Sequence, residues 1–288
     1  MTARILDGKA LAQQVRAEIT QQVAALKVET GLVPGLSVVL VGENPASQVY
    51  VRSKEKASKA AGMRGEVRAF AADVSEATLI ETIDALNADP HVHGILVQLP
   101  LPAHVNERRV LERVDPNKDV DGFHPHNVGL LASGHPRFVP CTPLGIRKLL
   151  EGGSVNTRGA HAVVLGRSNI VGRPMAWLLL QKGPGGDATV TVCHTGTKDV
   201  GVEARQADIL IAAMGRPEQV RADWVKPGAV VIDVGIHKRA DGTLCGDVHF
   251  PSVAEVASQI TPVPGGVGPM TVAMLLHNTL QAARISLR

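Results

Sequence analysis

The chain has 288 residues, a formal net charge of +3 and a hydrophobic fraction of 44%, which is enough apolar material for one large core or two modest domains. Aromatic residues make up only 2% of the sequence and no sustained lysine and arginine tract occurs, so nucleic-acid binding is not expected. No stretch is apolar for long enough to act as a signal peptide or to span a bilayer, and we expect no membrane partner. Cys141, Cys193 and Cys245 are odd in number and far apart, which argues against a disulfide framework or a clustered zinc site and fits a reducing cytoplasm.

Apolar, β-rich runs alternate with longer helical patterns, which predicts an α/β protein whose parallel strands are covered on both faces. Domain boundaries are expected near Pro140 and near the proline- and glycine-rich segment 262–266, after which a last helix could return to the first domain. The stretch 183–186 is interpreted as a surface turn. In chain order, the expected elements are a helix at 9–27, a strand at 36–41, helices at 45–61 and 75–87, a strand at 94–98, a helix at 143–151, a strand at 162–165, a helix at 172–181, strands at 189–192, 209–213 and 229–234, and a helix at 270–285.

The only tyrosine, Tyr50, lies four residues before Lys54 in the helix expected at 45–61. Asn44 and Pro45 mark the start of that helix, since they are a capping residue and a proline that the first turn tolerates. The spacing places the phenol and the amine on one helix face, where they could share a planar heterocyclic substrate. A packed tyrosine and a solvated lysine are the ordinary alternative.

Residues 161–174 predict a strand, a glycine-bearing turn and a helix, an arrangement in which backbone N–H groups and a helix N-terminus can meet a pyrophosphate. The turn does not match G-x-G-x-x-G because Ser168 replaces the second glycine, and no P-loop Gly-Lys-Ser/Thr follows. Ser168 also lies outside a G-x-S-x-G elbow, so a serine hydrolase is disfavoured. Dinucleotide binding and a turn that binds nothing both stay open at this point.

The tip of the strand expected at 189–192 carries no acidic residue to hold a ribose 2′-hydroxyl. Thr195 can donate a hydrogen bond to a phosphate there, and Arg167 is near enough in sequence to the glycine turn to assist. This composition favours NADP over NAD, although Asp199 follows a few residues later.

Gln98 ends a predicted strand, where open α/β sheets place ligand groups, although an edge amide bonded to a loop would look the same. Asp119 and Asp121 alternate along a segment that we expect to be extended, so one can face a site while the other binds backbone in the turn. A paired-carboxylate glycosidase is therefore not favoured. His124 and His126 lack a third ligand at a suitable spacing, and no metal is expected.

Six motifs extend from about residue 40 to the C-terminal helix: Tyr50-x-x-x-Lys54-x-Lys56, Val97 to Pro102, Asp119 to Pro125, Pro140 to Pro143, Gly166-Arg167-Ser168-x-x-Val171-Gly172, and Pro262 to Thr271. Their number and order closely resemble the bifunctional methylenetetrahydrofolate dehydrogenase/methenyltetrahydrofolate cyclohydrolase family, the FolD family. Each motif alone is weakly specific.

The resemblance implies two α/β domains flanking a cleft. Residues 1–140 plus 268–288 would form an N-terminal catalytic, folate-binding domain onto which the C-terminal helix packs back, and residues 141–267 a Rossmann-type NADP-binding domain. It further implies NADP-dependent oxidation of 5,10-methylenetetrahydrofolate to 5,10-methenyltetrahydrofolate, followed by hydrolysis to 10-formyltetrahydrofolate. A cytoplasmic homodimer in one-carbon metabolism, serving tetrahydrofolate interconversion and purine biosynthesis, would be typical of the family.

The resemblance also assigns roles by position. Lys54 would be the general acid/base of the hydrolytic step, and Gln98 would position or tune its amine. Tyr50 would stack on the pterin ring system, and Asp121 would accept hydrogen bonds from the pterin amino and ring N–H groups. The remaining positions are Pro264, Gly265 and Gly266 for the folate pocket, and Gly166, Arg167, Ser168, Thr195 and Ile236 for NADP.

The chain departs from the family pattern at Thr195, where relatives commonly have serine, and in the glycine-rich stretch 183–186, which looks longer than usual. Three alternatives stay open. The chain could be an NADP-dependent oxidoreductase acting on another pterin or small carbonyl, a monofunctional dehydrogenase with weak cyclohydrolase activity, or a nucleotide-binding protein without chemistry.

Overall fold

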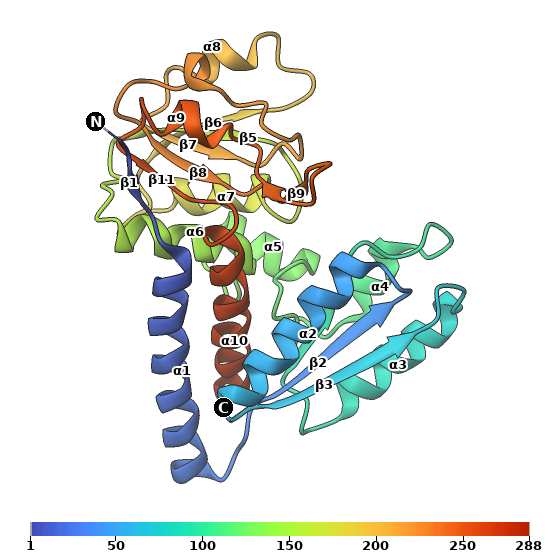
Figure 1. Ribbon diagram of the computed structural model, residues 1–288. Coiled ribbons are helices and arrows are strands. Elements are labelled where there is room, and N and C mark those ends of the chain that lie inside the picture. Colours follow the sequence, from blue (N-terminus) through green and yellow to red (C-terminus); the bar gives the residue numbers. More distant parts are fainter. Residues whose placement is uncertain (1, 288) are drawn as a thin grey trace. The chain divides into compact units, whose positions relative to one another are not determined.

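The computed structural model of the chain describes residues 2–287 (Figure 1). They separate into two compact units. The 13–130 unit also contains residues 136–141 and those from 272 onward, and the 142–271 unit also contains the residues up to 12 and residues 131–135. Four helices therefore run across the unit limits: α1 (Gly8–Thr30), α5 (Pro125–Ala132), α6 (Cys141–Gly152) and α10 (Val267–Ile285).

The 13–130 unit is built on a three-stranded parallel sheet in the order β3-β2-β4. All residues of the central strand are buried, as expected for a parallel strand covered on both faces. One core cluster combines residues of β2 and β4 with the apolar sides of α3 and α4. The elements are β2 (Gly35–Val41), α2 (Pro45–Ala60), β3 (Arg64–Phe70), α3 (Glu76–Ala88), β4 (Gly94–Val97) and α4 (Glu107–Arg113).

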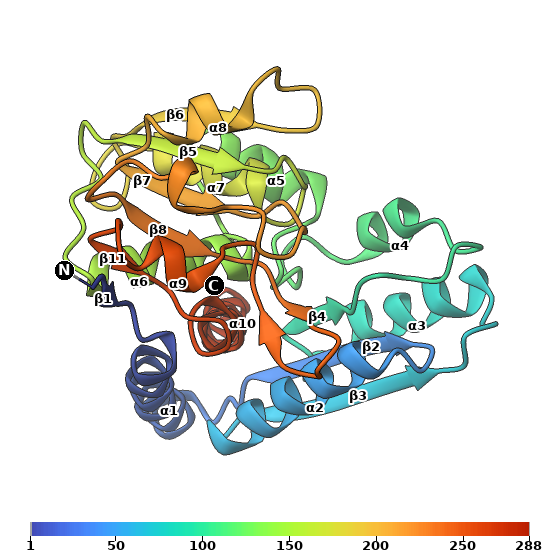
Figure 2. The ribbon, with the colours of Figure 1, turned by 45° about the horizontal axis from the view of Figure 1, so that its top comes forward.

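A second core cluster in this unit joins three segments that are distant in sequence. Ile19 and Val23 of α1 and Leu276 and Leu280 of α10 pack together with Met63, which precedes β3. Figures 1 and 2 both show α1 and α10 side by side. The C-terminal helix is thus part of the core of the 13–130 unit from residue 272 onward.

The 142–271 unit contains a six-stranded parallel sheet in the order β1-β11-β8-β7-β5-β6. Alternate residues of β5 face opposite sides, and both sides are buried. Because β6 and β7 lie on opposite sides of β5, the sheet has a topological switch point there, where open α/β sheets bind ligands. The strands are β1 (Arg4–Ile5), β5 (His161–Leu165), β6 (Thr189–Cys193), β7 (Ile209–Ala212), β8 (Val230–Asp233) and β11 (Gln259–Ile260).

Shorter elements complete this unit. Helices α8 and α9 contribute to a core cluster with residues of β5, β7 and β8, while α7 contacts β5 and β6. A small antiparallel hairpin, β9-β10, follows β8. Their bounds are α7 (Gly172–Leu180), α8 (Val200–Ala204), a 3-10 helix (Ala222–Trp224), β9 (His237–Lys238), β10 (Leu244–Cys245) and α9 (Phe250–Val253).

The prediction of an α/β protein with parallel sheets is confirmed, and every strand and helix expected from the sequence is present. The largest differences are at helix ends: α1 continues to Thr30 rather than ending at 27, and α10 begins at Val267 rather than at 270. Strand β3 was not predicted. It is an edge strand with charged Arg64 and Glu66 and a mostly exposed alternating pattern, so it lacks the concentration of apolar and β-branched residues that revealed the other long strands. Among the described residues, no helix combines the length and apolar character needed to cross a membrane.

Candidate active site

The amine of Lys54 is buried in the 13–130 unit, with only 7% of the residue exposed. Its Nζ donates a hydrogen bond of 3.0 Å to Oε1 of Gln98. The carboxamide has a fixed orientation because its Nε2 donates to the carbonyl oxygen of Leu99 at 2.9 Å. Gln98 is itself held by its backbone N–H, which donates to Val39 O at 2.9 Å and continues the β2-β4 pairing by one residue. The pair therefore joins a helix to the carboxyl end of a buried strand.

The start of α2 is as predicted. Pro45 is its first residue, and the side-chain oxygen of Asn44 accepts from the backbone N–H of Ser47 at 3.2 Å. One turn before Lys54, Tyr50 is partly buried, and this burial raises the pKa of its phenol above the ordinary value. The ring is thus a neutral, partly shielded plate on the helix that carries the amine.

Asp119 is a structural residue of the following turn. It is buried, and its carboxylate accepts from the backbone N–H groups of Phe123 at 3.2 Å and His124 at 2.9 Å. The side-chain amide of Asn127 adds a third donor at 2.8 Å. The prediction that one of the two aspartates binds backbone is confirmed, but the expectation of an extended segment was wrong, because residues 116–121 form turns and an isolated bridge.

Asp121 is the aspartate that interacts electrostatically with the amine. Burial raises the pKa of its carboxyl group, and the positive charge of Lys54 opposes that rise. The neighbouring thiol of Cys141 is fully enclosed, and burial raises its pKa well above the ordinary value, so it stays protonated. The amine and the carboxyl group are therefore close enough to interact, and Tyr50 lies one turn before the amine on the same helix.

Asn278 on α10 is a residue of this region that the sequence did not reveal. It is fully buried, and its Nδ2 donates to the carbonyl oxygens of Val120 at 2.8 Å and Val139 at 2.9 Å. It thus ties the residue before Asp121 to the segment before α6. A single asparagine within a mostly apolar helical pattern is the only sequence signal that could have pointed to it.

Both ring nitrogens of His124 are occupied. Its Nδ1 accepts from the backbone N–H of His126 at 3.1 Å, and its Nε2 lies 3.2 Å from the carbonyl oxygen of Glu112. Within residues 2–287, His, Cys, Asp and Glu side chains form no group of three that could hold a metal ion. The ring of His124 thus holds the chain at the start of α5, the helix that contains His126.

A pocket opens at the carboxyl ends of β5, β6 and β7 in the 142–271 unit. Gly166 has φ +122°, and a Cβ atom on it would collide with the carbonyl oxygen of Ala213. A Cβ on Gly172 would likewise collide with Gly166 O, so only glycine fits either position. The pocket is lined by Leu165, Gly166, Arg167, Ser168, Cys193, His194, Thr195, Thr197, Val200, Ala213, Met214, Arg216 and Gln219.

The lining of this pocket suits an anionic, phosphorylated ligand. Its lining residues include Arg167, Arg216 and Thr195, and they include no aspartate or glutamate. Asp199, which left the NADP preference open, caps α8 by accepting from the backbone N–H of Val202 at 2.9 Å. Ser168 Oγ accepts from Val171 N at 3.2 Å and so fixes the glycine turn. Four of the five predicted NADP positions line the pocket: Gly166, Arg167, Ser168 and Thr195.

Ile236 is the exception, since it does not line this pocket and is 45% exposed after β8. Arg216 was not predicted, although its place just after a recognised strand, at the ligand-binding edge of the sheet, was a usable signal. The Pro264–Gly266 loop is anchored to the start of α1, where Lys9 N donates to Gly265 O at 2.9 Å. This loop and the NADP positions belong to the 142–271 unit, whereas Lys54, Gln98, Tyr50 and Asp121 belong to the 13–130 unit.

Comparison with known proteins gives matches along nearly the whole chain. The family model described as "Tetrahydrofolate dehydrogenase/cyclohydrolase, catalytic domain" matches residues 6–121, and the one described as "Tetrahydrofolate dehydrogenase/cyclohydrolase, NAD(P)-binding domain" matches residues 140–287. A relative from Bordetella avium, named "Bifunctional protein FolD", is 58% identical over 287 residues, which cover 100% of this chain and 99% of the relative.

Two solved structures agree with this relationship. The FolD methylenetetrahydrofolate dehydrogenase/cyclohydrolase of Campylobacter jejuni has a TM-score of 0.94 at 48% identity, covering 98% of this chain and 99% of its own. The Trypanosoma brucei enzyme, solved with NADP cofactor and inhibitor, has a TM-score of 0.94 at 41% identity, covering 100% and 99%. On sequence and fold alike, this chain belongs to the tetrahydrofolate dehydrogenase/cyclohydrolase family.

Proposed function

We propose that this chain is a bifunctional one-carbon enzyme. It oxidises 5,10-methylenetetrahydrofolate to 5,10-methenyltetrahydrofolate with NADP, and then hydrolyses that product to 10-formyltetrahydrofolate. Family membership over the whole chain supports both reactions. The observation that carries the proposal is the buried Lys54 amine, oriented by Gln98, because hydrolysis needs a proton carrier placed beside the substrate rather than in bulk water.

In the hydrolytic step, the methenyl carbon is electrophilic because it is bonded to two nitrogens that share a positive charge. Water adds to this carbon, and Lys54 in its neutral form takes a proton from that water. The adduct then breaks the bond between this carbon and one nitrogen, and that nitrogen takes up the proton held by Lys54. The hydroxyl group of the adduct loses its own proton to solvent, so the carbon stays on the other nitrogen as a formyl group and one proton is released overall. Gln98 accepts one amine hydrogen at 3.0 Å and thereby directs the nitrogen lone pair away from itself.

The dehydrogenase step requires no dedicated base, since the substrate nitrogens stabilise the cation that forms. NADP, when bound, supplies the hydride acceptor. The residues present fit this cofactor: only glycine fits at positions 166 and 172 of the turn, and the pocket is lined by two arginines and no acidic residue. Gly166, Arg167, Ser168 and Thr195 would hold it and Ile236 would complete its site, so that positioning is the task of the protein.

The remaining roles concern the folate. Tyr50 stacks on the pterin, Asp121 accepts hydrogen bonds from its amino and ring N–H groups, and Pro264, Gly265 and Gly266 line the pocket. Functionally, residues 1–140 plus 268–288 serve as the catalytic, folate-binding domain and residues 141–267 as the NADP-binding domain. The partly buried ring of Tyr50 and the electrostatic contact between Asp121 and Lys54 support this assignment.

The protein works as a cytoplasmic homodimer that supplies one-carbon units, including those for purine biosynthesis. Three free, buried cysteines fit a reducing compartment, and two-fold dimers are the commonest oligomers of such enzymes. Sedimentation at micromolar concentration is expected to give twice the chain mass of 30.3 kDa. A species of single-chain mass would refute the dimer without touching the chemistry.

The direct test of function follows NADPH and methenyltetrahydrofolate at their separate absorbance bands in one cuvette. With methylenetetrahydrofolate and NADP, the purified protein is expected to form both, and the methenyl signal then decays as 10-formyltetrahydrofolate accumulates. NAD in place of NADP should give a much lower kcat/KM. Absence of NADPH formation with this substrate would overturn the dehydrogenase assignment, and a methenyl signal that decays no faster than in buffer would overturn the cyclohydrolase assignment.

A further inference from the structure

Asp247 is a fully buried carboxylate whose acceptor positions are all used within the 142–271 unit. Its Oδ2 accepts from the backbone N–H groups of Met214 at 2.5 Å and Gly215 at 2.9 Å. Its Oδ1 accepts from the backbone N–H of Arg216 at 3.0 Å and from Nε2 of His237 at 2.7 Å. Three successive N–H groups thus converge on one internal anion, in the manner of an anion-binding nest.

These three N–H groups belong to the loop that follows β7 and forms one wall of the cofactor pocket. Met214 and Arg216 line that pocket together with Arg167. Gly215, between them, has φ +69°, a conformation that favours glycine. Because the backbone donors of the loop are bound by Asp247, Asp247 fixes the backbone position of Met214, Gly215 and Arg216. Arg216 is the charged residue of this stretch of the pocket lining, so its place at the pocket depends on a carboxylate that does not itself line the pocket.

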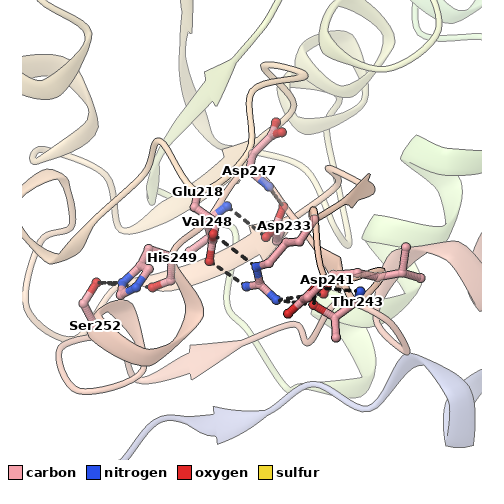
Figure 3. Close-up of polar contacts among 10 residues, drawn as sticks. Glu218, Asp233, Asp241, Thr243, Asp247, Val248, His249 and Ser252 are labelled. Atoms are coloured by element: carbon pink, nitrogen blue, oxygen red, sulfur yellow. Dashed lines mark hydrogen bonds and ion pairs between the residues drawn. The ribbon is translucent and has the colours of Figure 1, made fainter.

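Asp247 is held in place by a second buried carboxylate, Asp233, at the end of β8 (Figure 3). Asp233 Oδ1 accepts from the backbone N–H of Asp247 at 2.8 Å and of Gly235 at 3.0 Å, and its Oδ2 accepts from Val248 N at 3.0 Å. A Cβ atom on Gly246 would collide with the Asp233 carboxylate, so glycine is required beside it. A continuous set of hydrogen bonds thus runs from a central strand to the pocket wall.

The same segment holds a second part of the wall. Glu218 N donates to Gly246 O at 2.9 Å, and Val220 N donates to Asp247 O at 2.9 Å. Gln219, between these two residues, lines the pocket. Residues 246–249 therefore fix both stretches that follow β7, one through the Asp247 side chain and the other through backbone pairing.

We infer that Asp247 is a positioning residue of the NADP site, a role that rests on the proposed function. It acts through the Met214–Arg216 loop without touching the cofactor. An amide in its place would keep one acceptor oxygen and present an N–H₂ group to backbone donors that it cannot satisfy. The loop would be released and Arg216 would lose its fixed backbone position at the pocket, while Lys54 and Gln98, in the 13–130 unit, would be unaffected.

The test compares Asp247→Asn with Asp241→Asn. The control makes the same chemical change at exposed Asp241 in the β9-β10 hairpin, six residues before Asp247, where the hydrogen bonds given for its carboxylate among the described residues all come from Thr243 (Figure 3). NADP affinity is measured directly by calorimetry, and hydrolysis of methenyltetrahydrofolate is measured without NADP. Asp247→Asn is expected to raise the Kd for NADP about 10-fold to 100-fold, as for the loss of one or two charge-assisted hydrogen bonds. Its hydrolytic kcat/KM should stay within about twofold of wild type, because local loop release removes no interaction of that step. The control should match wild type in both measurements.

A Kd for NADP in Asp247→Asn equal to that of wild type would overturn the inference. If Asp247→Asn fails to fold, and so loses both NADP binding and hydrolysis, the role of Asp247 is tested instead by amide hydrogen exchange in the wild-type protein. The N–H groups of Met214, Gly215 and Arg216 should exchange slowly without NADP, and exchange as fast as in exposed turns would refute the role of Asp247. Failure of the proposed function has a different outcome, since the wild-type protein itself would then not bind NADP or not hydrolyse the folate.

Discussion

At the scale of single residues, function depends on which partner a buried group is given. Lys54 is buried, yet its hydrogen-bond acceptor is the neutral amide of Gln98 at 3.0 Å. A neutral acceptor orients the amine without the strong stabilisation of the charged form that a carboxylate in direct contact would provide. Arg167 shows the reverse case, since it is exposed and lines a pocket that we propose binds the anionic cofactor.

Gln98→Glu tests the first of these points. A carboxylate at the position of the amide would hold the amine in its charged form, which cannot accept a proton from water. We expect cyclohydrolase kcat to fall by at least about tenfold, a fraction of the usual contribution of general base catalysis. NADP-dependent oxidation should change much less. If the Gln98→Glu variant hydrolysed methenyltetrahydrofolate as fast as wild type, a neutral hydrogen-bond acceptor for Lys54 would not be required for this reaction.

Arg167→Gln tests the proposed role of Arg167 in binding the anionic cofactor. Removing one guanidinium from a pocket without acidic residues should weaken NADP binding about 10-fold to 100-fold, as for the loss of a charge-assisted phosphate contact. Binding of NAD, which lacks the 2′-phosphate, should change little. Parallel losses for both cofactors would place Arg167 on a phosphate that the two cofactors share.

At the scale of helices and strands, the sequence predicted the apolar, buried strands, and it missed the charged edge strand β3 and the short helix α4. β2, β5 and β7 were found because each is a mostly apolar run that is buried on both faces. β3 was missed because its charged residues lie at a sheet edge, and α4 because seven residues give too little periodicity.

The candidate site shows the same division. The Tyr50–Lys54 spacing is local, so it could be read from the sequence, and Gln98 was placed by the rule for strand ends. The contact between Asp247 and the Met214–Arg216 loop joins positions about thirty residues apart, and local patterns carry no information on such pairing. The same holds for Asn278, which bonds to residues more than a hundred positions earlier.

The end of β8 carries a pH-dependent contribution to stability. Burial raises the pKa of Asp233 to about 7, whereas an unfolded aspartate titrates near about 3.9. The folded protein binds this proton more tightly, so the contribution is present at low pH and is lost as the pH rises through about 7.

Urea unfolding of wild type and Asp233→Asn at pH 8.0 and pH 5.5 checks this sign. On lowering the pH, wild type should gain about 2 kcal/mol relative to the variant, which lacks the titrating group. The test compares how much the free energy of unfolding of each protein changes between the two pH values, so it is valid even if the variant is less stable at both. Parallel changes in the two proteins would show that Asp233 titrates alike in the folded and unfolded states.

At the scale of the whole molecule, each unit has its own core and its own set of functional groups. The 13–130 unit holds the Lys54–Gln98 pair and Asp121, and the 142–271 unit holds the glycine turn and the basic pocket. The proposed reactions divide in the same way, since hydrolysis needs a proton carrier and oxidation needs a positioned cofactor. The two activities should therefore be separable by mutation.

Lys54→Met, with both activities followed in one cuvette, tests this account most directly. Cyclohydrolase kcat should fall by at least about 100-fold, the lower range for loss of a general acid/base, while NADP-dependent oxidation stays within about tenfold of wild type, since it requires no base. Lys59→Met is the matched control, because this exposed lysine on the same helix pairs only with Glu55, and both of its activities should equal those of wild type. Wild-type hydrolysis by Lys54→Met, or an equal loss of both activities in a folded variant, would contradict the account.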